Sequence, residues 1–179
     1  MRFIHTADIH LGASPDAGSA YSQRRAEELW NSLERLVKVC EEEQVDLLLI
    51  AGDLFHRQPL LRELKEVDYL FSQLTHTKIV FIAGNHDYLK PSSYYLTYQW
   101  KSQVYPLLEQ TMGFVEFEEL GTSVYGFSYG QKEIREALYT DAFPQKKQPV
   151  EILIAHGGDE KHIPIQRNNI MNLGYDYVA

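Results

Sequence analysis

Four apolar segments of this sequence each lead into residues that can bind a metal ion, and this repeated pattern constrains the fold more than any other feature. The plainest segment, residues 45–51, is a run of strand-forming residues followed by Gly52 and Asp53. The other segments are residues 2–7, 78–83 and 150–155. The metal-binding residue types that follow the four segments are Asp8 and His10, Asp53, Asn85, His86 and Asp87, and His156. Because α/β sheets bind ligands beyond the carboxyl ends of their strands, we expect these side chains to gather at one end of the strands.

The segments between the first three strands have the periodicity of amphipathic helices. Apolar residues recur with helical spacing from Tyr21 to Glu43, and again from Leu60 to Leu74. Proline is favoured in the first turn of a helix, so Pro59 marks the start of the second one. The order strand, helix, strand, helix, strand predicts a parallel sheet with right-handed crossovers.

The rest of the chain is less regular. In chain order we expect short helices or an ordered loop over 92–110, a β-hairpin of 114–120 and 123–129, a short helix over 133–139, a linker over 143–149, an extended loop as far as Arg167 and the start of a strand over 174–179. No internal repeat or domain boundary interrupts residues 1–179, so we expect a single domain.

Composition excludes several classes of protein. A chain of 179 residues with 44% hydrophobic residues suits a globular domain, and a net charge of −8 argues against a dedicated basic nucleic-acid module. The one cysteine, Cys40, lies in a helical pattern, so no disulfide framework is expected and a cytoplasmic location fits. We find no signal peptide and no apolar run near the roughly 18–20 residues that span a membrane.

Each metal-binding motif is weak by itself. The Gly52-Asp53 pair could simply mark a turn, and Asp8 could be a helix-cap or turn residue. His10 could be an ordinary surface histidine and His156 an ordinary loop histidine. The segment 84–87 is more specific, because it places an amide, an imidazole and a carboxylate directly behind a glycine at a strand end. A turn by itself does not require a histidine at position 86.

In this order, the motifs Asp-x-His, Gly-Asp, Gly-Asn-His-Asp and His-Gly resemble those of the calcineurin-like metallophosphoesterases over nearly the whole chain. Residues 5–12 (HTADIHLG) and 52–56 (GDLFH) are most similar to the branch of SbcD-type DNA repair exonucleases. The resemblance implies an α/β fold in which a β-sandwich is flanked by helices, in αββα layers. It also implies a metal-dependent phosphodiester hydrolase.

The resemblance further implies a dinuclear metal site with a bridging hydroxide. Asp8 and His10 would bind the first ion, Asn85 and His156 the second, and Asp53 both. Two carboxylates facing two divalent ions would leave about two positive charges to attract a phosphate diester. Mixed oxygen and imidazole ligands suit manganese, iron or zinc, and manganese is the ion that this branch usually uses.

His86 is not a metal ligand in this family. The resemblance implies that it donates a proton to the leaving oxygen or stabilises charge on the phosphoryl group, while Asp87 accepts its ring N–H and orients it. His56 would contact the substrate or support the metal site, and a purely structural role for it stays open. The other histidines and nearby cations have no expected role in catalysis: His5 and His76 (structural), His162 (unassigned), and Arg57, Lys90 and Arg167 (solvated surface charges).

The sequence departs from the family pattern at its end. The family continues with a strand and a Gly-His-x-His motif whose two histidines complete the metal site, whereas here the last residues are Tyr177, Val178 and Ala179. We therefore expect residues 1–179 to be a nuclease domain without the last ligand loop, the capping domain and the region that binds a coiled-coil ATPase partner. Such a fragment should bind metal weakly and be a poor enzyme, and its exposed last strand allows a homodimer. A natural short protein that takes ligands from another chain is the alternative.

Three functions stay open at this point. The first is hydrolysis of DNA by an exonuclease or endonuclease, which the net charge of −8 weakens. The second is a small-molecule phosphodiesterase or phosphatase of the same fold, and the third is a non-catalytic binding module. Manganese-dependent cleavage of DNA ends would separate the first from the second, and replacement of His86 would separate both from the third.

Overall fold

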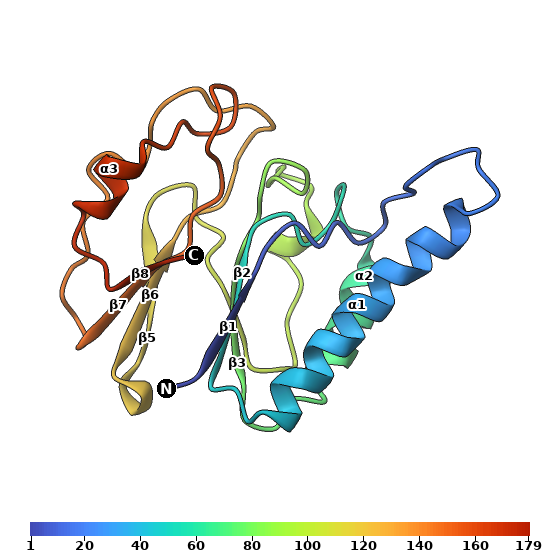
Figure 1. The fold of residues 1–179 in the computed structure, drawn as a ribbon, viewed down its shortest axis with the longest axis horizontal. Helices are drawn as coiled ribbons and strands as arrows, with labels where there is room; N and C mark the ends of the chain where they lie inside the picture. Colours follow the sequence, from blue (N-terminus) through green and yellow to red (C-terminus); the bar gives the residue numbers. More distant parts are fainter.

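The computed structural model describes all residues from 1 to 179 and contains two four-stranded sheets (Figure 1). The first sheet has the order β1-β2-β3-β4, and all its neighbours are parallel. Its strands are β1 (Phe3–Thr6), β2 (Leu47–Ala51), β3 (Lys78–Ile82) and β4 (Val104–Pro106). The predicted parallel arrangement of the first three strands is therefore confirmed. The short strand β4 lies in the segment for which only helices or a loop were predicted; a 3₁₀ turn, Tyr94–Leu96, precedes it.

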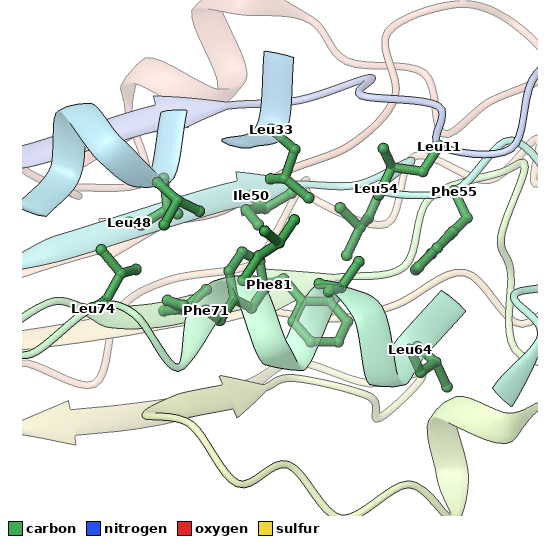
Figure 2. Packing of buried hydrophobic residues seen from close by; sticks show 14 of the residues in the cluster. Leu11, Leu33, Leu48, Ile50, Leu54, Phe55, Leu64, Phe71, Leu74 and Phe81 are labelled. Carbon is green, nitrogen blue, oxygen red and sulfur yellow. The ribbon is translucent and has the colours of Figure 1, made fainter. Parts of the chain in front are cut away.

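Two helices cover one face of this sheet. They are α1 (Ser22–Glu42) and α2 (Leu61–Phe71), close to the predicted bounds. Successive right-handed crossovers that move in one direction across a parallel sheet put their helices on the same face. Figure 2 shows the apolar core between this face and the helices, with Leu48, Ile50 and Phe81 from the strands and Leu33, Leu64 and Phe71 from the helices. Neither helix is both long and apolar enough to cross a membrane.

The second sheet packs against the other face of the first. It has the order β5-β6-β7-β8, with strands β5 (Gly113–Phe117), β6 (Thr122–Gly126), β7 (Val150–Leu153) and β8 (Tyr177–Val178). Strands β5 and β6 form the predicted antiparallel hairpin, connected by a 3₁₀ turn over Glu118–Leu120, and the other neighbours are parallel. Strand residues alternate between faces, so β2 sends Leu47 and Leu49 toward Val124 and Ile152 of the second sheet. This arrangement confirms the predicted α/β fold with a β-sandwich flanked by helices.

The outer face of the second sheet is covered mainly by loops and by one short helix, α3 (Arg167–Met171), which the sequence did not predict. The helix predicted over 133–139 is wrong, because that segment contains no α-helix. Ile134 instead pairs with the 159–163 loop: its N–H donates to the Lys161 carbonyl, and the Ile163 N–H donates to the Ile134 carbonyl. A seven-residue segment forms an unstable helix by itself, so these contacts decide its conformation.

One buried carboxylate, Asp68 on α2, fixes the segment that leads into β4. It accepts hydrogen bonds from the Tyr98 hydroxyl, the Lys101 N–H, and both the N–H and the hydroxyl of Ser102. Burial by itself would raise the pKa of Asp68, but the hydrogen bonds from Ser102, Lys101 and Tyr98 outweigh it and hold the pKa below its usual value.

We predict that Asp68→Ala lowers the free energy of unfolding by roughly 2–4 kcal/mol at pH 7, because several partly buried donors lose their buried acceptor. Since the folded-state pKa is depressed, the contribution of Asp68 is fully present above its unfolded pKa of about 3.9 and is lost as the pH falls through the folded value. Urea denaturation at pH 7 and at acid pH measures both effects. Glu66→Ala, an exposed carboxylate on the same helix, is the control. Equal losses in the two variants would refute the prediction.

Candidate metal centre

The predicted metal-binding residues meet at the carboxyl ends of strands from both sheets. The loops after β1 and β2 run side by side, since the Asp8 N–H donates to the Gly52 carbonyl and the His10 N–H donates to the Asp53 carbonyl. Asn85 and His86 follow β3 of the same sheet, while His156 follows β7 of the second sheet. The site therefore lies where the ends of the two sheets come together.

Asp53 occupies the centre of this arrangement and is almost fully buried, with a side chain 2% exposed. Its Oδ1 accepts a hydrogen bond of 2.9 Å from the N–H of His86. Its Oδ2 lies 3.8 Å from Nε2 of His10 on one side and 3.6 Å from Nε2 of His156 on the other. One carboxylate oxygen thus faces two imidazoles that come from different sheets.

The remaining predicted ligands divide between these two sides. On the first side, Asp8 Oδ1 lies 3.6 Å from His10 Nε2, and the donor atoms of Asp8, His10 and Asp53 all lie within 4.8 Å of one another. On the second side, Asn85 Oδ1 lies 2.9 Å from His156 Nε2. The structure therefore brings together all five residues that were predicted as ligands, in the two groups expected.

The orientation of His156 is set by groups that the sequence did not identify. Its Nδ1–H donates to the Ala51 carbonyl over 2.8 Å, so in the neutral ring Nε2 carries the free lone pair toward Asp53. Tyr139 accepts a hydrogen bond from the His156 N–H, and the Tyr129 hydroxyl donates to the His156 carbonyl. Burial raises the pKa of both tyrosines, which remain hydroxyl donors at neutral pH.

The backbone at this site is strained. Asp8, His10 and Asp53 have φ angles of 54°, 52° and 52°, a left-handed conformation that few non-glycine residues adopt. Such conformations cost on the order of 1–3 kcal/mol each and concentrate at functional sites, where surrounding contacts enforce them. Three predicted ligands with this conformation indicate a site whose geometry is imposed by the fold.

Two glycines make room for the predicted ligands. A Cβ atom at Gly52 would overlap the ring of His156, and one at Gly84 would overlap the carboxylate of Asp53. In the sequence these glycines served only as markers of strand ends. The structure shows that no side chain fits at either position while the ligands keep their places.

We predict that Gly52→Ala displaces His156 and so weakens Mn²⁺ binding about tenfold or more. Losses of this size are typical when groups that support a metal ligand are disturbed. Gly18→Ala is a matched control, since Gly18 has the same φ of 89° but no atom within 4 Å of an added Cβ. Both variants should lose about 1–2 kcal/mol of stability from the left-handed backbone. Calorimetric titration with Mn²⁺, together with urea denaturation, separates the two effects. Equal metal affinity in both variants would contradict the role of the close approach.

The predicted contact between Asp87 and the His86 ring is wrong. Asp87 is completely buried and points into the core, where it accepts hydrogen bonds from the N–H groups of Phe55 and Gly84 and from the Tyr95 hydroxyl. Burial raises the pKa of its carboxyl to about 6. Asp87 therefore connects the loop after β2 to the loop after β3, the two loops that carry Asp53 and Asn85.

His86 and His56 lie beside the first group of predicted ligands. The Nδ1–H of His86 donates to the His56 carbonyl over 3.2 Å, and Nδ1 of His56 lies 3.4 Å from Nδ1 of His10. Burial lowers the pKa of His10, which favours the neutral ring that a metal ligand requires. His56 is exposed, so this face of the site opens to solvent.

The other histidines and cations singled out in the sequence lie outside this cluster, and most of them have their own partners. His5 contacts the Tyr177 hydroxyl, His76 pairs with Asp46, His162 pairs with Asp159, Arg57 forms a two-point ion pair with Glu63, Lys90 lies over the ring of Tyr88, and Arg167 begins α3.

The chemistry of the donors fits divalent cations. Around His156, a ring lone pair, an amide oxygen and a carboxylate oxygen face one another with no donor among them, an arrangement that a cation stabilises. Donors bound at 2.0–2.2 Å to one small cation lie roughly 3–3.5 Å apart, close to the separations of 2.9 to 3.8 Å seen here. The mixture of oxygen and imidazole suits a transition metal better than calcium.

Comparison with known proteins agrees with this chemistry. The family model for calcineurin-like phosphoesterase matches residues 1–179. The uncharacterized metallophosphoesterase YhaO of Bacillus subtilis is 28% identical over all of this chain and 47% of its own length. The DNA double-strand break repair protein Mre11 of Methanosarcina mazei is 37% identical over 49% of this chain, and a subunit of the nuclease SbcCD of Bacillus subtilis is 36% identical over 49% of it. The matches cover 14% and 22% of those two proteins, so this chain spans less than half the length of each relative.

Proposed function

Because this chain belongs to the calcineurin-like phosphoesterase family, we propose that it hydrolyses phosphodiester bonds and acts on DNA as an exonuclease or endonuclease. The observation that carries the proposal is the position of Asp53 Oδ2, between His10 of the first sheet and His156 of the second. A carboxylate oxygen shared in this way suits two cations side by side.

The proposed ligands are Asp8 and His10 for one ion, Asn85 and His156 for the other, and Asp53 for both; Mn²⁺ is the proposed metal. When bound, a pair of divalent ions polarises a phosphate and lowers the pKa of a bound water. Two of the proposed ligands are already held in position by hydrogen bonds. Asp53 accepts one from the His86 N–H, and His156 donates one to the Ala51 carbonyl. Preorganised ligands reduce the free-energy cost of organising the site around a cation.

His86 is the proposed proton donor to the leaving oxygen. Its backbone N–H is anchored on Asp53 and its Nδ1–H on the His56 carbonyl, so both its backbone and its ring orientation are fixed. A positioned general acid typically contributes 10²–10⁴-fold to the rate. Its partner is the His56 carbonyl, in place of the Asp87 carboxylate expected from the sequence.

DNA is the proposed substrate because Mre11 and the SbcCD nuclease are among the relatives, each matching about half of the chain. The net charge of −8 is unfavourable for DNA, but bound cations would reverse the local charge at the strand ends. A cytoplasmic location belongs to the same proposal, since Cys40 is a buried free thiol. A coiled-coil ATPase partner is proposed for the whole protein only.

The test compares end-labelled duplex DNA with bis-p-nitrophenyl phosphate, each with Mn²⁺, using wild type, His86→Gln and His76→Gln. We expect release of nucleotides from DNA by wild type and His76→Gln, and a loss on the order of 10²-fold or more in His86→Gln with unchanged Mn²⁺ binding. Hydrolysis of the small ester alone would favour a small-molecule phosphodiesterase or phosphatase. DNA binding without hydrolysis, unaffected by His86→Gln, would favour a non-catalytic binding module.

A further inference from the structure

Three imidazoles form a second group of candidate ligands at the open face of the site. The ligand atoms of His10, His56 and His86 all lie within 4.8 Å of one another. The ring centres of His56 and His86 are 4.7 Å apart, and that of His10 lies 4.7 Å from His86 and 5.3 Å from His56. No carboxylate belongs to this group, which distinguishes it chemically from the group around Asp53.

The two nitrogens of His10 face different groups. Nε2 faces the carboxylates of Asp8 and Asp53, at 3.6 and 3.8 Å, whereas Nδ1 lies 3.4 Å from Nδ1 of His56. His10 therefore stands between an oxygen-rich group of donors and a group made only of nitrogens.

We propose that His10, His56 and His86 form an alternative binding site for a divalent ion that prefers nitrogen ligands, such as Cu²⁺ or Zn²⁺. Three neutral imidazoles are a common ligand set for zinc, and Cu²⁺ binds such donors most tightly among the first-row divalent ions. The exposed side of His56 gives an ion a direct route from solvent.

The two sites compete for His10. A neutral imidazole has one N–H and one lone pair, so it binds a single metal, through one nitrogen, unless it loses a second proton. An ion in the three-histidine site uses Nδ1 and leaves the proton on Nε2, which then cannot bind an ion beside Asp8 and Asp53. Such an ion would also bind the imidazole of His86. The inference goes beyond hydrolysis: a nitrogen-preferring metal bound here would displace metal from the Asp8 side and block the proposed proton donor.

Electron paramagnetic resonance of Cu²⁺ in a non-coordinating buffer tests the site directly, without any measurement of hydrolysis. With one equivalent of Cu²⁺, we expect wild type and His76→Gln to show hyperfine structure from three nitrogens. His56→Gln should bind Cu²⁺ about tenfold more weakly or worse and show fewer nitrogens. His86→Gln should behave in the same way, which provides a second test if one variant folds poorly.

Competition with Mn²⁺ tests the sharing of His10. In wild type, excess Mn²⁺ should weaken Cu²⁺ binding, whereas in Asp8→Asn it should do so less, because the first group has lost a carboxylate. Asp8→Asn should retain the three-nitrogen spectrum. The proposal is overturned if His56→Gln and His86→Gln keep the wild-type spectrum and affinity, if Asp8→Asn loses the spectrum, or if Mn²⁺ has no effect in wild type. A protein inactive toward every phosphodiester but with these Cu²⁺ results would refute the proposed function alone.

Discussion

Replacing Asp53 by asparagine is expected to weaken Mn²⁺ binding strongly at both groups of proposed ligands while the fold stays intact. Asparagine keeps an oxygen that can accept the His86 N–H, now bonded to Oδ1. Its amide NH₂ would then face His10 and His156 in place of Oδ2, so a donor replaces the shared negative oxygen. We expect the affinity for Mn²⁺ to fall about 10²-fold or more, beyond the 10–100-fold loss usual for groups that only support a ligand.

Asp16→Asn is the matched control for this prediction. Asp16 has a φ of 54°, nearly that of Asp53, but it is exposed and lies in the loop before α1. Calorimetric titration with Mn²⁺ should show wild-type affinity for Asp16→Asn, and both variants should unfold near the wild-type urea midpoint. If Asp53→Asn binds Mn²⁺ as tightly as Asp16→Asn does, Asp53 is not a shared ligand.

The positions of the proposed ligands could be predicted from strand ends, because α/β folds place their binding residues there. The run Leu47–Ala51 is buried on both faces, so its apolar character identified a central strand and put Asp53 at its end. The same reasoning located Asn85 and His86 after β3 and His156 after β7. Local patterns determine these placements, since each depends on a strand and the residue behind it.

Contacts between distant segments were not predictable in the same way. The segment 133–139 is held by hydrogen bonds to the 159–163 loop, and its Tyr139 hydroxyl accepts a hydrogen bond from the His156 N–H. The conformation of the segment therefore depends on partners more than fifteen residues away. The burial of Asp87 was missed for a similar reason. The family resemblance implied a pair with its neighbour His86, whereas its actual partners Phe55 and Tyr95 are placed by the packing of α2 and the first sheet.

The contacts of Asp87 predict a large effect on stability. Asp87→Ala should lower the free energy of unfolding by roughly 3–5 kcal/mol, because the buried N–H groups of Phe55 and Gly84 and the hydroxyl of Tyr95 all lose their acceptor. The loops after β2 and β3 would also lose their connection. We therefore expect Mn²⁺ affinity to fall as well, although Asp87 faces away from the proposed ligands.

Tyr95→Phe separates the two consequences, because it removes one hydrogen bond to Asp87 and leaves both backbone donors satisfied. It should lower the free energy of unfolding by only about 1 kcal/mol and leave Mn²⁺ binding nearly unchanged. Urea denaturation and calorimetric titration of the two variants measure the difference. If Tyr95→Phe is as damaging as Asp87→Ala, the tyrosine hydroxyl is the essential contact. If Asp87→Ala unfolds like wild type, the buried carboxylate does not hold the two ligand loops together.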